Sequence, residues 1–490
     1  MRWRIAALLV MGAIGVCTPG AAYGATPGMQ LGFTDVVTIQ ETPLARPLAL
    51  QRLKGTRATI IRLMWRWRDI EVLRPPDDRT ARDPGWTGYD WTALDATLRD
   101  IAAAGGLTAL VEVSGAPPWW EGPERPAVSD AAPQGTWRPN AAAFGRFMHA
   151  AARRYAGNHP DPLRPGSPLP RVRLWQAWNE PNLDYFLSPQ WTRTQNGFKS
   201  ASPAWYKVML NTAYDEIKSA TSGATVFAAG TAPFGDPNPG GLRMPAGRFV
   251  RELLCVSGRV RPKARRCARN PVKFDAMAHH PYPIGPPGRH ALNPDDIVVP
   301  DFDKIKRPLA VALAAGNVYP RKRKPIWATE MSWDSSPPDP GGIEWVTQAR
   351  YAAGAMYVLW RQGIRTLLWW NLHDDPRGSG YQNSLQSGVY MRGETMLQDS
   401  PKPLLTAFRF PFVAYGTKSR SRGRRLAKIW GMAPSAGQVQ IQRQYGSSWR
   451  TVLTVRAARN RIFQARLPAG RGARLRATQA GEISIDAKVF

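Results

Sequence analysis

The chain has 490 residues, enough for one large domain and a small one, and its 66 Lys and Arg against 36 Asp and Glu give a formal net charge of +30. No stretch of the chain reaches about 18 uninterrupted apolar residues, which excludes a membrane-spanning helix of ordinary length. Three cysteines without a Cys-x-x-Cys pair support neither a structural zinc site nor a redox motif.

The first 25 residues have the order of a secretory signal peptide. Arg2 and Arg4 precede an apolar run from Ile5 to Val16, and small residues follow. Cys17 raises the alternative of lipid attachment, but Val16 is a poor small residue before it. We therefore expect residues 1–25 to be removed and the mature protein to be secreted or associated with the cell envelope.

If the protein is exported, the two cysteines outside the signal peptide lie in an oxidising compartment. Cys255 and Cys267 close a short loop, and in an oxidising compartment a disulfide between them is favoured. A bridge across a loop of that size is worth about 3 kcal/mol. The alternative is two free buried thiols.

From residue 28 to residue 415, short apolar strands alternate with amphipathic helical stretches. Strands are expected at 30–37, 59–65, 107–113, 171–178, 224–229, 274–280, 325–330 and 364–370. Helices are expected at 47–54, 90–104, 140–155, 203–219, 248–254, 303–314, 342–360 and 403–415. This pattern predicts an α/β fold, a (β/α)₈ TIM barrel with a parallel sheet. The alternative, an open doubly wound sheet, would carry a Gly-rich phosphate loop after the first strand, and none is present.

Residues 416–490 have a different pattern. Short alternating segments are separated by Gly and Ser turns at 426–430, 438–442, 451–455, 462–465, 473–477 and 483–489, which predicts a small, sandwich-like antiparallel β domain. From Lys418 onward there are sixteen Lys or Arg and two Asp or Glu. Such a surface attracts polyanions. In an exported protein these would be an acidic envelope polymer or polysaccharide rather than nucleic acid. The alternative is that the arginine content merely follows the proteome.

Polar and aromatic residues stand at the carboxyl ends of several expected strands, where barrels place their chemistry. The second strand carries Arg62, the fourth ends in Asn179 and Glu180, and the seventh ends in Glu330. The sixth and eighth strands add the following residues: His279, His280, Tyr282, Trp369, Trp370 and Asn371. Paired carboxylates flanking a bond, with aromatic faces for sugar rings, are typical of a glycosidase site.

The sequence Trp178-Asn179-Glu180-Pro181-Asn182, followed much later by Trp327-Ala328-Thr329-Glu330, resembles clan A of the glycoside hydrolases. His280-Pro281-Tyr282 is similar to the His-x-Tyr of cellulase-like (family 5-like) members, and Arg62 resembles their strand-two arginine. The Trp-Asn-Glu-Pro-Asn form looks most like family 39. The resemblance implies a retaining barrel enzyme with Glu180 as acid/base and Glu330 as nucleophile.

Charge considerations lead to the same assignment. Two carboxylates about 5 Å apart repel by roughly 3 kcal/mol at an effective dielectric near 20, so one stays protonated. Arg62 and Tyr282 can donate to Glu330, which makes Glu330 the ionised partner and Glu180 the proton donor. Asn179 is expected to bind the sugar 2-hydroxyl.

Other residues have a structural interpretation beside the functional one. Adjacent histidines on a strand point to opposite faces, so His279 and His280 do not make a metal pair, and we expect neither a metal nor a cofactor. Three further tryptophans fit sugar subsites or the core equally well: Trp65, Trp119 and Trp120. Glu112 is left out of the site because it lies within a strand.

The sequence therefore predicts an exported retaining glycoside hydrolase that cleaves O-glycosidic bonds of a poly- or oligosaccharide. His280, Tyr282, Trp369 and Trp370 are expected to bind substrate together with Arg62 and Asn179. The alternative is a catalytically silent protein that binds carbohydrate or the cell envelope.

Overall fold

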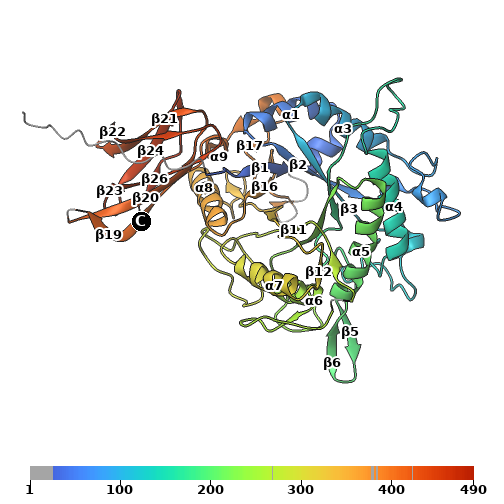
Figure 1. Cartoon of the computed structure of the whole chain (residues 1–490). Helices are drawn as coiled ribbons and strands as arrows, with labels where there is room; N and C mark the ends of the chain where they lie inside the picture. Colours follow the sequence, from blue (N-terminus) through green and yellow to red (C-terminus); the bar gives the residue numbers. More distant parts are fainter. Residues whose placement is uncertain (1–25, 268, 377–379, 382–383, 422, 490) are drawn as a thin grey trace, which may run out of the picture.

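A computed structural model describes residues 26–267, 269–376, 380–381, 384–421 and 423–489. The predicted signal peptide, residues 1–25, lies outside these ranges. Eight parallel strands close into a barrel in the order β1-β16-β13-β11-β7-β4-β3-β2 (Figure 1). Their bounds are β1 Gln30–Thr34, β2 Ile60–Arg66, β3 Thr108–Ser114, β4 Leu174–Ala177, β7 Thr225–Thr231, β11 Ala276–His279, β13 Ile326–Ala328 and β16 Thr366–Trp370.

Helices alternate with these strands and surround the barrel. Their bounds are α1 Arg46–Gly55, α2 Trp67–Ile70, α3 Thr92–Ala104, α4 Ala141–Arg154, α5 Ser202–Ala220, α6 Ala246–Leu253, α7 Asp303–Ala314, α8 Trp345–Arg361 and α9 Pro403–Arg409. Single π or 3₁₀ turns lie at Val37–Glu41, Thr80–Arg82, Pro118–Trp120 and Met396–Gln398. The predicted (β/α)₈ barrel is confirmed.

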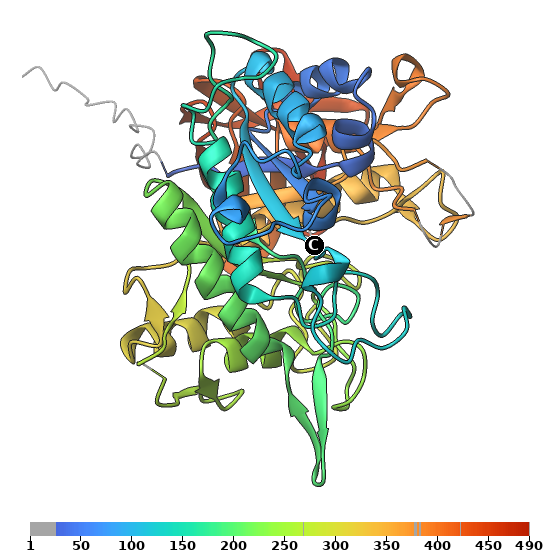
Figure 2. The same cartoon turned by 90° about the vertical axis from the view of Figure 1, so that its right-hand side faces the viewer.

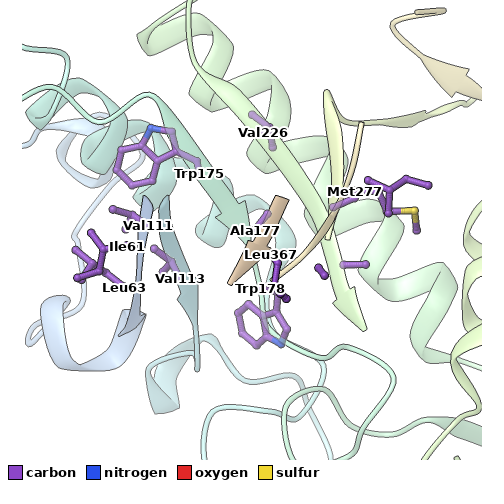
Figure 3. Close-up of a cluster of buried hydrophobic side chains, with 14 of the residues drawn as sticks. Ile61, Leu63, Val111, Val113, Trp175, Ala177, Trp178, Val226, Met277 and Leu367 are labelled. Atoms are coloured by element: carbon purple, nitrogen blue, oxygen red, sulfur yellow. The ribbon is translucent and has the colours of Figure 1, made fainter. Parts of the chain in front are cut away.

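Side-chain alternation along the strands separates two apolar cores. One cluster fills the barrel interior and consists of Ile60, Leu110, Phe227, Ala276, Ala278 and Leu368. The other lies between strands and helices and includes Ile61, Val111, Trp175, Val226, Met277 and Leu367 (Figure 3). Because successive side chains point to opposite faces, Arg62, Glu112 and Gln176 fall on the interior side with the first cluster.

One local prediction was wrong. The helix expected at 403–415 ends at Arg409, because Pro411 cannot donate to a helical ladder, and β19 begins at Phe412. Between β4 and α5 the chain forms a hairpin of β5 (Trp191–Thr194) and β6 (Gly197–Ser200). This hairpin projects from the barrel in both views (Figures 1 and 2).

The C-terminal region consists of two antiparallel sheets, as predicted. One has the order β19-β20-β23, and the other has the order β22-β21-β24-β25 with β26 beside β24. Their bounds are β19 Phe412–Ser421, β20 Arg424–Met432, β21 Gly437–Tyr445, β22 Ser448–Ala457, β23 Ile462–Pro468, β24 Arg474–Gln479, β25 Glu482–Ile483 and β26 Ala487–Lys488. The sheets share a core that includes Ile429, Ile441 and Leu475. Trp430 packs instead on Tyr357 of α8 (ring centroids 5.7 Å apart), which joins this region to the barrel.

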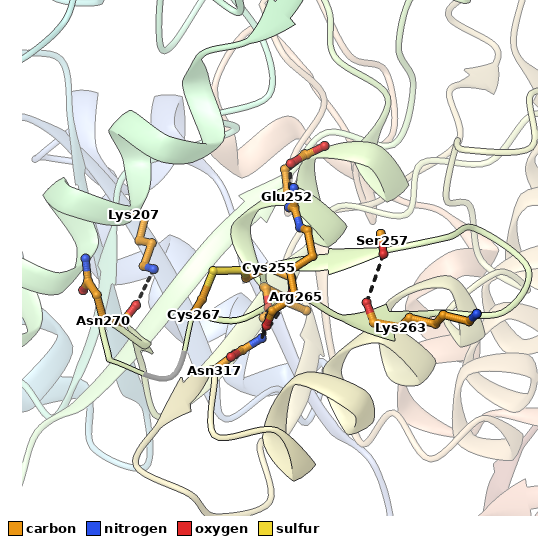
Figure 4. Close-up of a disulfide and its surroundings, with 10 residues drawn as sticks. Lys207, Glu252, Cys255, Ser257, Lys263, Arg265, Cys267, Asn270 and Asn317 are labelled. Carbon is orange, nitrogen blue, oxygen red and sulfur yellow. Dashed lines mark hydrogen bonds and ion pairs between the residues drawn. A yellow bond between two sulfur atoms is a disulfide. The ribbon is translucent and has the colours of Figure 1, made fainter.

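The predicted disulfide between Cys255 and Cys267 is present, with Cα atoms 6.2 Å apart (Figure 4). It lies beside the small sheet β8 (Val256–Ser257) and β9 (Lys263–Ala264). The Asn317 amide donates to the carbonyl groups of Cys255 and Arg265, which holds the bridged loop against the turn between α7 and β12. Further two-stranded pairs are β10 (Val272–Lys273) with β12 (Val318–Tyr319), β14 (Ser335–Ser336) with β15 (Ile343–Glu344), and β17 (Tyr390–Met391) with β18 (Ser400–Pro401). Among the described residues, no helix is both long enough and apolar enough to cross a membrane.

Candidate active site

The turn after β4 holds Glu180 in an unusual backbone conformation. Trp178 and Glu180 have positive φ angles of 74° and 36°, a region that costs non-glycine residues on the order of 1–3 kcal/mol each. The turn is fixed by its neighbours: the Glu180 N–H donates to Gly230 O at 3.1 Å, and the buried Asn182 amide donates to Ala232 O and Met244 O. The carboxyl group of Glu180 is thereby held at the carboxyl end of the barrel.

Glu330 follows β13 and receives a donor on each of its carboxyl oxygens. Arg62 Nη1 donates to Oε1 at 2.5 Å, and the Tyr282 hydroxyl donates to Oε2 at 3.1 Å. The Arg62 side chain is fully buried and that of Glu330 is 7% exposed. In such surroundings a permanent positive charge and a hydroxyl donor both favour the ionised carboxylate.

Glu180 has a different set of partners. His280 Nδ1 lies 2.8 Å from its Oε1, and His280 Nε2 lies 3.5 Å from Oε1 of Glu330. Burial, and after it the positive charge of Arg62, lowers the pKa of His280 well below its usual value, so the imidazole is neutral. A neutral ring carries one N–H and therefore leaves one nitrogen as an acceptor for a protonated carboxyl group.

The two glutamates lie close together. Glu180, His280 and Glu330 each offer one oxygen or nitrogen atom, and these three atoms lie within 4.8 Å of one another. Burial, and next the negative charge of Glu330, raises the pKa of Glu180 well above its usual range. Burial also raises the pKa of Glu330, whereas Arg62 and Tyr282 act in the opposite direction. The environment therefore favours a proton on Glu180 and a negative charge on Glu330.

Arg62 also orients the amide groups around it. Its Nη2 donates to Oδ1 of Asn179 at 2.7 Å, and its Nε donates to Oε1 of Gln176 at 3.3 Å. With Oδ1 engaged, the Asn179 Nδ2 remains as a donor near the two carboxyl groups. The structure thus brings together Arg62, Asn179, Glu180, His280, Tyr282 and Glu330 in one buried cluster.

The predicted pair Trp369 and Trp370 is split by strand alternation. Trp369 is fully buried, packs on Phe408 of α9 (centroids 5.7 Å apart) and donates its indole N–H to Ser387 O at 2.8 Å. It belongs to the core between strands and helices, so the expectation that it binds substrate is corrected. Trp370 has the parity of the interior residue Leu368 and is partly exposed at the strand end.

His279 also points away from the cluster, as its position beside His280 predicted. It is fully buried, and its Nδ1 lies 2.8 Å from the Thr231 hydroxyl. Trp65 points to the helix-facing side of β2, as Ile61 and Leu63 do, and packs against the core on that side. Neither residue reaches the carboxylate pair through the described contacts.

One further buried carboxyl group lies on the interior side of the barrel, although the sequence analysis left it out of the site. Glu112 is fully buried on β3, between Met64 of β2 and Gln176 of β4 in register. Within the described residues neither of its oxygens has a hydrogen-bond partner, and burial raises its pKa to about 7. The alternation of β3 (Leu110 inside, Val111 outside) is the signal that places Glu112 on the interior side.

A second glutamate that the sequence did not single out, Glu71, binds tryptophans that follow β2 and β3. Glu71 is buried and accepts indole N–H groups from Trp67 and Trp119 at 2.9 Å each and from Trp120 at 2.5 Å. A cavity of about 290 Å³ adjoins Trp120. Trp119 and Trp120 are thus fixed, partly exposed rings, and Trp120 also packs against the apolar core.

Three groups have the spacing that a metal ion would need: Glu180, His280 and Glu330. Arg62 already donates to Glu330 from within the same cluster, and its positive charge opposes a cation there. The described donor set therefore fits a neutral organic group more closely than a metal ion.

Comparisons with known proteins agree with the barrel fold. No protein-family model matches the chain, and no curated protein matches it. The structure of a family 39 glycoside hydrolase from the gut symbiont Bacteroides cellulosilyticus WH2 is similar over 90% of this chain and 81% of that chain, with 14% identity and a TM-score of 0.53. A monomeric beta-xylosidase from Caulobacter crescentus CB15 is similar over 95% of this chain and 97% of that chain, with 14% identity and a TM-score of 0.51. The resemblance predicted from the sequence is confirmed at the level of the fold.

Proposed function

We propose that the chain is a retaining O-glycoside hydrolase. The observation that carries the proposal is the pair of carboxyl groups at the barrel mouth, with one oxygen of Glu180 within 4.8 Å of one oxygen of Glu330. Retaining enzymes hold their two carboxyl groups about 5–5.5 Å apart, whereas inverting enzymes need roughly 6.5–9.5 Å to admit a water molecule. The short separation supports double displacement. The similar structures named above support the same class of reaction.

In the first step, Glu330 attacks the anomeric carbon while Glu180 gives its proton to the departing glycosidic oxygen. The C–O bond to the leaving group breaks, and an ester bond between the sugar and Glu330 forms. The donors Arg62 and Tyr282 keep Glu330 ionised before the attack. The neutral His280 keeps the Glu180 carboxyl oriented toward the bond.

In the second step, Glu180 is a carboxylate and takes a proton from water. The resulting hydroxide oxygen attacks the anomeric carbon, the ester bond to Glu330 breaks, and the configuration is restored. As the charge on Glu330 is consumed in the first step, its repulsion of the Glu180 charge disappears. Glu180 therefore becomes a stronger acid when it must lose its proton, and its basicity returns when Glu330 is released.

The groups around the pair supply substrate contacts. Asn179, oriented through its Oδ1 by Arg62, presents its Nδ2 to the 2-hydroxyl of the sugar. Trp370 provides an aromatic face at the end of β16, and such faces stack on the apolar side of pyranose rings. The substrate class is a poly- or oligosaccharide.

The exported location is also part of the proposal. The disulfide between Cys255 and Cys267 is supported by the structure and is typical of extracellular proteins. The charged, apolar and small-residue order of residues 1–25 supports a signal peptide. We further propose that residues 28–415 act as the catalytic unit and residues 416–490 as a separate β domain.

A panel of aryl glycosides tests the activity. Turnover of at least one substrate is expected, and Glu330→Ala should reduce it by several orders of magnitude, because a missing nucleophile removes the first step. Glu394→Gln is the matched control, since Glu394 is exposed and lies far along the chain from the site. A chain that binds a polysaccharide but turns over no substrate would instead be a silent binding protein.

The assignment of the two glutamates has its own test. A 2-deoxy-2-fluoro glycoside of the accepted sugar should form a stable ester, and peptide mapping should locate it on Glu330. Labelling of Glu180 would reverse the proposed assignment. Release of product with inverted configuration, followed by NMR, would contradict double displacement.

A further inference from the structure

One face of the five-stranded C-terminal sheet has a regular polar pattern. Along β21, Val439 and Ile441 point into the shared core, so the residues at alternating positions along the strand point outward. These outward residues are four glutamines: Gln438, Gln440, Gln442 and Gln444. We call this surface the glutamine face. It lies on the side of the sheet opposite the core with β19, β20 and β23.

The neighbouring strands add arginine and aromatic side chains to the glutamine face. Strand pairing places Arg476 of β24 opposite Gln442, Trp449 of β22 opposite Gln444, and Arg456 opposite Gln438. Arg476 and Gln442 share a face because the next pair, Leu475 with Arg443, has the parity of the buried core. The glutamine face thus combines amides, guanidinium groups and an indole.

Arg476 is fixed in position before any ligand arrives. Its guanidinium carbon lies 4.3 Å from the centroid of the Trp449 ring, and its Nε donates to Oε1 of Gln442 at 2.8 Å. Within the described part of the chain, its Nη1 and Nη2 make no hydrogen bond, so both remain available. A planar guanidinium with two available N–H groups matches a carboxylate in bidentate fashion.

The glutamine face carries more positive than negative charge. Strands β21, β22 and β24 contain no Asp or Glu, and three of their five arginines, Arg456, Arg474 and Arg476, lie on the side of the glutamines. Arg474 is paired with Asp486, at 2.8 Å, whereas Arg456 and Arg476 have no acidic partner among the described residues. An anionic ligand therefore meets two arginines without acidic partners on a partly exposed strand surface.

We propose that the glutamine face binds an acidic polysaccharide. Carboxylate groups of the polymer bind to Arg476 and Arg456, its hydroxyl groups exchange hydrogen bonds with the glutamine amides, and one sugar ring packs beside Trp449. An amide both donates and accepts, which suits hydroxyl groups better than it suits phosphates or lipid headgroups. From Gln438 to Gln444 the strand extends about 20 Å, long enough for several sugar units in a row.

This inference goes beyond the proposed catalysis and does not depend on it, because binding at the C-terminal sheet requires no turnover. The test is affinity electrophoresis of the full-length chain in gels containing polygalacturonate. All variants carry Glu330→Gln, so that cleavage cannot remove the polymer, and thermal unfolding confirms that each is folded. A gel containing fully methyl-esterified polygalacturonate supplies the same backbone without its charge.

Polygalacturonate should retard the chain, and the esterified polymer should retard it much less. The double variant Arg456→Gln/Arg476→Gln should bind about tenfold more weakly, since charge-assisted bidentate bonds are the strong ones on such a surface. Gln440→Ala/Gln444→Ala should also weaken binding while leaving the charge unchanged. That second variant separates the glutamine face from a general electrostatic effect.

The matched control is Arg443→Gln/Arg450→Gln, which removes the same charge from the same sheet. These two arginines are paired with each other and have the core-facing parity of Leu475, so they lie off the glutamine face. The control should bind within about twofold of the parent chain. Equal loss in both arginine variants, or equally tight binding of double-stranded DNA or anionic vesicles, would overturn the proposal.

Discussion

The charge coupling between the two glutamates gives a measurable prediction for Glu330→Gln. The substitution removes the negative charge that lies closest to Glu180 and leaves the positive charge of Arg62 without its anionic partner. Both changes favour the ionised form of Glu180. The pKa of Glu180, which burial and Glu330 raise in the intact site, is therefore expected to fall.

The size of this effect follows from the separation. Two unit charges about 5 Å apart interact by about 3 kcal/mol at an effective dielectric near 20. Removing one of them should lower the titration midpoint of the other by on the order of two pH units. The remaining rise in the pKa of Glu180 comes first from burial and then from the charge of Glu112, neither of which the substitution removes.

Carbon-13 NMR of protein labelled at glutamate Cδ measures the midpoint directly. The Glu180 resonance is assigned by its absence in a Glu180→Gln variant. Glu394→Gln serves as the control, because the exposed Glu394 should not influence Glu180. A Glu180 midpoint that stays within half a pH unit after Glu330→Gln would refute the coupling and, with it, the division of labour between the two carboxyl groups.

Three further predictions concern neighbouring residues. Tyr282→Phe removes a donor to the ionised form of Glu330, so the pKa of Glu330 should rise and the acid limb of kcat/KM should move to higher pH; an unmoved limb would argue against the contact. Burial raises the pKa of Glu112 in the folded chain to about 7, whereas in the unfolded chain it is near 4.5. The folded state therefore has its full stability while Glu112 is neutral, below about pH 4.5. This contribution to the free energy of unfolding is lost as the pH rises through about 7. In urea unfolding, the free energy of unfolding of Glu112→Gln should therefore rise by on the order of 3 kcal/mol relative to that of the parent chain between pH 4 and pH 8. A difference between the two chains that does not depend on pH would contradict this. Trp369→Ala should cost about 3–5 kcal/mol of unfolding free energy, whereas Trp370→Ala should mainly raise KM; the opposite pattern would refute their placement.

The sequence predicted the barrel because its signals are local and repeated. Each expected strand lies within a few residues of its observed bounds, and the helix expected at 303–314 coincides with α7. The end of the helix expected at 403–415 was misplaced because the apolar residues of β19 continue the helical pattern. The signal that Pro411 ends the helix was available but was outweighed by that pattern.

Site residues could be predicted from the sequence where their type and their place at a strand end are enough to locate them. Glu180, Glu330 and Arg62 meet because parallel strands bring their carboxyl ends to one rim. Trp369 and Trp370 could not be separated in this way, since a strand buried on both faces has no polar alternation to reveal which side is inside. Their assignment needed the pairing of β16 with β1 and β13.

The buried Arg62 explains why the two glutamates are not interchangeable. A fully buried guanidinium requires an anionic partner, because an isolated charge in the interior costs several kcal/mol or more. Glu330 contacts it directly, while Glu180 contacts a neutral imidazole. A proton moved from Glu180 to Glu330 would leave Arg62 beside a neutral carboxyl group and Glu180 charged without a cation in contact. The arrangement with Glu330 ionised is therefore the lower in free energy, and the same contact that stabilises the fold around Arg62 favours Glu330 for the proposed role of nucleophile.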